Sequence, residues 1–434
     1  MIITFGDKIL VTKEKIDKVL CSLYLFVLVF APPIIPYPYL FLTIISFLAL
    51  ITTHRLTVWN VIRKSGIYEW VSVMALLAIY TIIVPLPISV RCNDIVNISH
   101  YISIINRYGV MIVVVSVCVT YLLCKAEQNR YGYEFLIESF IDAGVLEGTC
   151  SILAFLFPNV KNFFIFFMKR FSESMLYSNT WYITVRSYGF ASTLVDVFGF
   201  GVGVIAGICF FYGITGKKKY IIESVVIAVA TLLNSRTGLL IYIIAVVVSI
   251  LCVLQKRHFR KMLTTVIAIG ILAFLSSNII RIMSTNEYTL GWFQSGINSV
   301  FDFINGTGNS TGDAMSTLFQ DDFWKLPDFP RIIFGTGHSI YRAEGYVHSD
   351  VGYINELWLF GIIGCLLLYG KIVEMCMSLK RKSQIELFKY AAIFLLVSYF
   401  FFNIKGVALG YNPGAVSVFI IIFVGKYQSE QCME

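Results

Sequence analysis

Residues 348–356 hold the residue types of a general acid–base site. They end a long polar loop and open an apolar stretch, so Ser349 is a plausible helix N-cap with His348 above the helix N-terminus. Free N–H groups and the helix dipole favour an anion there. A neutral His348 imidazole can take a proton from a hydroxyl, and Asp350 can orient it or act as the base. Alternatively, both residues only cap the helix.

Three arginines are candidates for binding an anion. Arg236 lies in a short turn between two apolar stretches, and the first stretch is so short that Arg236 is expected below the membrane surface. A cation there normally faces the protein interior or a water-filled cavity, where its guanidinium can bind a diphosphate bidentately. Snorkelling to lipid headgroups is the alternative. Arg186 is either a membrane-interface anchor or a ligand contact, and Arg331 is a weaker candidate.

Three more residues are assigned supporting roles. Tyr353 and Glu356 belong to the same block as His348. Asp196 is ionisable, is expected near the outer membrane surface, and could pair with Arg186 or Arg236.

An acidic face is expected on the helix at 133–157. Glu134, Glu138 and Asp142 are four residues apart and therefore share one side, and Glu147 follows. One interpretation is an ion-coupling stripe of a transporter. The other is a set of internal salt bridges near the inner membrane surface.

The composition indicates which kind of fold positions these residues. Of 434 residues, 57% are apolar and only 14% are charged, against about 25% charged in soluble domains. An ordinary soluble enzyme, a disordered chain and a disulfide scaffold are therefore excluded. The sequence predicts an all-α, polytopic integral membrane protein with about twelve transmembrane helices. The predicted spans are 19–33, 37–53, 67–89, 108–124, 133–157, 190–213, 220–234, 237–254, 262–281, 351–370, 387–404 and 411–425.

The distribution of charge predicts the orientation. With the N-terminus inside, 22 of the 34 lysines and arginines fall in inner segments, as the positive-inside rule requires. Both termini are then cytoplasmic, and residues 1–434 form one transmembrane domain. Two outer loops are long: 158–189, and the acidic, aromatic-containing 282–350, which we expect to be partly helical and folded onto the bundle. Gly199, Gly203 and Gly207 predict a close-packing helix face.

Motifs for soluble catalysis are absent. The sequence has no phosphate-binding P-loop, no HExxH, no GxSxG and no Rossmann fingerprint, and no CxxC among its ten cysteines. ATP-driven chemistry within this chain is therefore not expected, and the prediction includes no metal, no cofactor and no nucleic-acid partner. An outer-side reaction would need an already activated donor.

The layout resembles the O-antigen polymerase (Wzy-type) members of the O-antigen polymerase/ligase superfamily. The resemblance rests on about twelve spans, a large late outer loop, the Ser-Arg-Thr-Gly turn at 235–238, and the blocks 333–337, 348–353 and 359–364. It implies a GT-C-type polymerase/ligase fold in the bacterial inner membrane, with the active site periplasmic.

The activity implied is a metal-independent glycosyl transfer. The growing glycan would leave undecaprenyl pyrophosphate and join a hydroxyl of a new lipid-linked repeat unit, with inversion. Arg186 and Arg236 match arginines that bind the donor pyrophosphate, and His348 with Asp350 matches the position of the base. Arg331 is a weaker candidate for the pyrophosphate site. The implied partners are the undecaprenyl-pyrophosphate-linked oligosaccharide, the bilayer, a chain-length regulator and a flippase.

Two other functions remain open. An O-antigen ligase uses the same donor but delivers the glycan to lipid A-core. A lipid-linked sugar flippase would suit the number of spans and the acidic face of 133–157, but it does not require the long outer loop that precedes His348.

Overall fold

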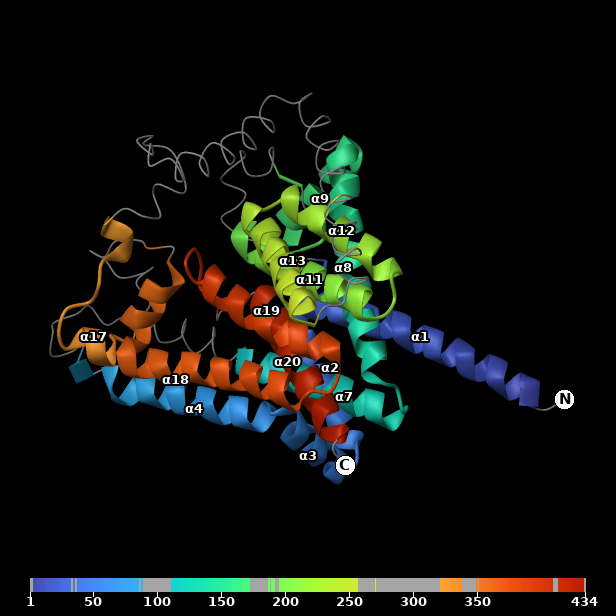
Figure 1. Ribbon diagram of the computed structural model, residues 1–434, viewed down its shortest axis with the longest axis horizontal. Helices are drawn as coiled ribbons and strands as arrows, with labels where there is room; N and C mark the ends of the chain where they lie inside the picture. Colours follow the sequence, from blue (N-terminus) through green and yellow to red (C-terminus); the bar gives the residue numbers. More distant parts are fainter. Residues whose placement is uncertain are drawn as a thin grey trace.

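The computed structural model describes residues 3–32, 34–35, 37–85, 87–88, 111–171, 186–187, 189–191, 195–256, 270, 321–337, 349, 351–408 and 413–432. All regular elements in these ranges are helices (Figure 1). They are α1 (Ile3–Phe30), α2 (Pro38–Thr52), α3 (Arg55–Ser65), α4 (Ile67–Ile83), π-helical η1 (Met111–Val115), α7 (Ser116–Gln128), α8 (Tyr133–Leu156), α9 (Pro158–Phe171), α11 (Val195–Thr215), α12 (Lys219–Leu232), α13 (Arg236–Lys256), 3-10 helical η3 (Asp321–Trp324), α17 (Arg331–Phe334), α18 (Gly352–Lys382), α19 (Glu386–Phe402) and α20 (Pro413–Gln431).

Several of these helices can span a membrane. α8, α11, α13 and α18 are each long and apolar enough, and α3 with α4 qualifies as one span bent by 71°. The protein is therefore an all-α protein with membrane-spanning character. Every predicted span except 262–281 overlaps a described helix, and 262–281 lies outside the described residues apart from Gly270. The number twelve stays a prediction.

α11 is the central helix of the described bundle. It is almost entirely buried and packs against α8, α12, α13, α19 and α20 (Figure 1). Its glycines allow this packing: a Cβ on Gly203 would lie 2.6 Å from the carbonyl oxygen of Gly238 in α13, and one on Gly199 would lie 2.5 Å from Ser235. The predicted close-packing glycine face is confirmed.

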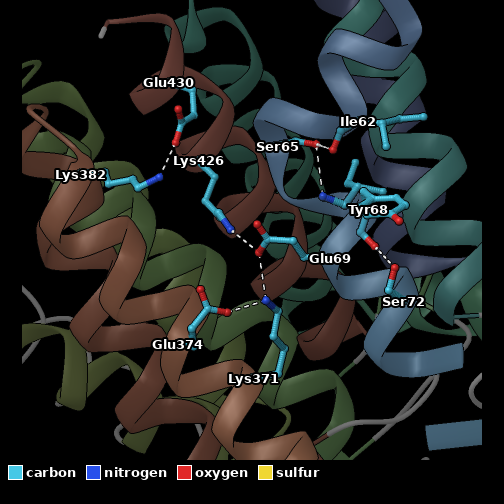
Figure 2. Close-up of polar contacts among 11 residues, drawn as sticks. Ile62, Ser65, Tyr68, Glu69, Ser72, Lys371, Glu374, Lys382, Lys426 and Glu430 are labelled. Carbon is cyan, nitrogen blue, oxygen red and sulfur yellow. Dashed lines mark hydrogen bonds and ion pairs between the residues drawn. The ribbon is translucent and has the colours of Figure 1, made fainter. Parts of the chain in front are cut away.

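The basic residues predicted to lie inside meet acidic residues at one end of the bundle. Lys18 of α1 pairs with Glu138 of α8 at 2.7 Å. Elsewhere at this end, Glu69 of α4 binds Lys426 of α20 and Lys371 of α18 (Figure 2).

The opposite end of the same helices holds the first turns of α11 and α20 and the last turn of α19. There the rings of Phe200 and Phe402 stack with centroids 4.3 Å apart, and Gly414 packs directly on Phe200. The α12–α13 turn lies at this end too, because Ser235 contacts Gly199.

α18 is two helical segments joined by a break at Gly361, whose φ is 64° and ψ −178°. The break frees carbonyl groups that a continuous helix would use internally. The backbone N–H of Thr336 donates to the carbonyl of Trp358 at 2.7 Å, and that of Gly337 donates to Leu359 at 3.1 Å. Two sequence blocks, 333–337 and 359–364, are thus docked together through their backbones.

Candidate functional site

The segment that carries Arg186 is bound to the turn that leads to Arg236. The backbone N–H of Ser187 donates to the carbonyl of Leu233 at 3.2 Å, and Asn234 Nδ2 donates to the carbonyl of Ser187 at 3.0 Å. Arg186 is buried, and Arg236 is the first residue of α13. The structure therefore brings together two predicted anion-binding segments that lie about fifty residues apart in the chain.

Glu147 anchors the same segment from the other side. Its side chain is fully buried. One carboxylate oxygen accepts the N–H of Gly189 at 3.1 Å and that of Ala191 at 3.4 Å, and the other accepts Phe190 at 3.0 Å. Ser187 Oγ also donates to the carbonyl of Ser151 at 2.6 Å. α8 and the α12–α13 turn together hold the Arg186 segment in place.

The remaining carboxylates of α8 are engaged differently. Glu138 binds Lys18 and Lys217, Asp142 lies 3.5 Å from Lys18, and Glu134 lies 3.8 Å from Lys217. The hydrogen bond to Glu138 raises the pKa of Lys217. Of the two interpretations of the acidic face, the ion pairs favour internal salt bridges.

Glu138→Gln is expected to lower the free energy of unfolding by about 2 kcal/mol, because two lysines lose a partly buried partner. Unfolding in mixed micelles measures this. The matched control is Glu134→Gln, since Glu134 is largely exposed and pairs only with the exposed Lys217 among its described contacts; we expect less than about 0.5 kcal/mol. Equal effects of the two variants would contradict the assignment.

The start of α18 is held by the segment around η3. Ser349 Oγ donates to the carbonyl of Phe323 at 2.6 Å and accepts the N–H of Val351 at 3.2 Å. The N-cap position is Val351, so the prediction of Ser349 as the N-cap is wrong by two residues. Ser349 instead closes a turn just before the helix, and Trp358 Nε1 donates to the carbonyl of Lys325 at 3.0 Å.

Tyr353 and Glu356 fix the first turns of α18 to the end of α19. Tyr353 Oη donates to the carbonyl of Phe400 at 2.7 Å. The buried carboxylate of Glu356 accepts Asn403 Nδ2 at 2.8 Å and the hydroxyl of Tyr369. Tyr353 and Glu356 therefore position the first turns of α18. His348 and Asp350, the residues predicted to include the base, precede this helix in the chain.

Comparison with known proteins gives no match, whether by family model, by curated sequence or by solved structure.

Arg331 lies in a different part of the bundle. Its Nη1 is 2.6 Å from Asp328 Oδ1, and its short helix α17 packs against α18. Figure 1 shows α17 apart from α12 and α13. The structure groups Arg186 with Arg236 and does not place Arg331 beside them.

Some predicted residues lie outside the described part of the chain. These are His348, Asp350 and the side chain of Asp196, whose backbone is in the first turn of α11. In the ranges that are described, no group of three His, Cys, Asp or Glu side chains could hold a metal ion.

The arrangement suits binding of a phosphorylated group. Two guanidinium-bearing segments meet at the N-terminus of α13, where the helix dipole also favours an anion. Glu147, Ser151 and Asn234 are positioning residues that the sequence did not single out for this site. Their partners are main-chain groups, which leave no pattern of side chains to recognise.

Proposed function

We propose that the protein is a membrane glycosyltransferase of the O-antigen polymerase type. It transfers a glycan from undecaprenyl pyrophosphate to a hydroxyl of a second lipid-linked repeat unit. The observation that carries the proposal is the hydrogen bonding of the Arg186 segment to the α12–α13 turn, which assembles two cationic segments at one end of the bundle.

In this reaction the acceptor hydroxyl attacks the anomeric carbon while the bond from that carbon to the pyrophosphate oxygen breaks. The hydroxyl proton goes to His348 or Asp350, and the lipid pyrophosphate leaves with both bonding electrons. Arg186 and Arg236 stabilise the negative charge that develops on it. Since attack and departure occur on opposite faces, the anomeric configuration inverts.

The orientation follows from the two ends of the bundle. The lysine-rich end faces the cytoplasm, as the positive-inside rule expects. The arginine end then faces the periplasm of a bacterial inner membrane, where the flippase delivers its substrate and a chain-length regulator can act. A proton- or ion-coupled flippase is less well supported, because Glu134, Glu138 and Asp142, the acidic face of α8, are paired with lysines.

Purified protein in proteoliposomes with undecaprenyl-pyrophosphate-linked repeat units tests the proposal. We expect a ladder of polymer, and no ladder from His348→Ala or Asp350→Asn. An O-antigen ligase would form no ladder alone but would transfer glycan to added lipid A-core. If neither product forms, while His348→Ala and Arg236→Ala still support function in cells, the enzyme assignment is wrong.

A further inference from the structure

α3 and α4 meet at a sharp corner. The helices are bent by 71°, and Gly66 between them has a φ of 76°, in the region that favours glycine. Lys426 of α20 covers this residue: a Cβ on Gly66 would lie 2.6 Å from Lys426 Nζ. The corner is therefore packed against α20.

Ion pairs fix the direction of α4 at this corner. Glu69 Oε2 accepts Lys371 Nζ at 2.9 Å and Lys426 Nζ at 3.1 Å (Figure 2). Across the break, the backbone N–H of Ile67, the first residue of α4, donates to Ser65 Oγ at 3.5 Å. α4 alone is an apolar helix of 17 residues. With α4 crossing the membrane along its normal, the 71° bend places α3 close to the membrane plane at the lysine-rich end.

α3 presents a face that is both cationic and apolar. Arg55, Trp59 and Arg63 are four residues apart and lie on one side of the helix, where all three are exposed. Leu56 beside them is 65% exposed and Trp59 is 52% exposed. Residues 53–68 contain no acidic side chain. Val61 and Ser65 face inward and are buried.

We propose that α3 is an interfacial helix that binds the anionic headgroups of phospholipids. Leu56 and Trp59 insert at the level of the headgroups, and the ring of Trp59 also packs edge-on against Tyr68, with centroids 6.0 Å apart. Arg55 and Arg63, two turns apart, bind lipid phosphates on either side of Trp59. This lipid site is separate from glycosyl transfer and does not depend on it.

Brominated lipids, which quench tryptophan fluorescence on contact, test the proposal. The full chain is placed in nanodiscs of phosphatidylcholine and phosphatidylglycerol, with bromine on one lipid or on the other. The quenching lost in Trp59→Phe measures contact with Trp59. We expect the quenching that is due to Trp59 to be about fivefold larger with brominated phosphatidylglycerol than with brominated phosphatidylcholine. The double variant Arg55→Gln with Arg63→Gln should abolish this preference.

Lys218→Gln with Lys380→Gln is the matched control, because it removes two exposed charges outside α3. It should keep the preference; an equal loss would mean that general charge, not α3, attracts the lipid. Equal quenching by both lipids in the unmodified protein also overturns the proposal. If neither lipid quenches Trp59, the proposal is also overturned, and a protein partner such as a second copy of the chain is indicated instead. If the double arginine variant does not fold, the unmodified protein at 1 M salt replaces it, since the screening length falls to about 3 Å and the preference should vanish.

Discussion

Gly361→Ala is expected to lower the free energy of unfolding by about 4 kcal/mol. Its backbone conformation is one that essentially only glycine adopts, which costs any other residue about 1–3 kcal/mol. The new Cβ would also lie 2.3 Å from the carbonyl oxygen of Ile333, a backbone atom that cannot turn aside. Titration with denaturing detergent in mixed micelles measures the loss.

Gly370→Ala on the same helix is the control. Nothing lies within 4 Å of a Cβ placed on Gly370, so the change should be neutral or stabilise by up to about 1 kcal/mol. If Gly361→Ala were equally harmless, the break in α18 and its docking with residues 335–337 would not exist in the folded protein.

The second large effect is expected from the two arginines. Arg186→Gln and Arg236→Gln should each lower the kcat/KM for polymer formation by about 10²–10³, the usual cost of removing one group that stabilises developing charge. If both bind one pyrophosphate, the double variant should lose much less than the product of the two single losses. Initial rates with purified variants measure this, after unfolding titrations establish that the variants are folded.

Arg331 provides the comparison for this pair of single and double variants. It forms an ion pair with Asp328 beside α18, so we expect Arg331→Gln and Arg236→Gln to act independently, with their losses multiplying. Coupling between these two would restore Arg331 to the pyrophosphate site that the sequence suggested. Independence of Arg186 and Arg236, in contrast, would separate the two segments functionally despite their hydrogen bonds.

The local features of this fold could be predicted from the sequence. Apolar stretches mark helices wherever the chain is described, and the spacing of Gly199, Gly203 and Gly207 identified the packed face of α11. Both predictions depend only on residues within one helix. Predicting the ion pairs of Glu138 also requires that the start of α1 and the α11–α12 connection lie on the same side of the membrane. The distribution of lysines and arginines supplies that expectation.

Long-range backbone contacts could not be predicted in this way. Gly361 looked like an ordinary glycine of an apolar span, because its role depends on residues 333–337 being present to fill the break. Glu147 looked like the last member of an acidic face, although its partners are the N–H groups of residues 189–191. Residues 54–66 lie between two predicted spans, and nothing in their sequence reveals the 71° bend between α3 and α4.

The anchoring of the Arg186 segment has a consequence for how this sequence can vary. Glu147 holds residues 189–191 through main-chain N–H groups, which every amino acid except proline supplies. Space restricts these positions unequally: a Cβ on Gly189 would lie 2.6 Å from the Glu147 carboxylate, and Ala191 is fully buried. Phe190 is only partly buried, and its ring packs against Phe164. Under saturation mutagenesis, position 190 should therefore accept other large apolar residues but not proline, while Glu147, Gly189 and Ala191 tolerate few replacements. Sequence drift around Arg186 is thus expected to concentrate at position 190.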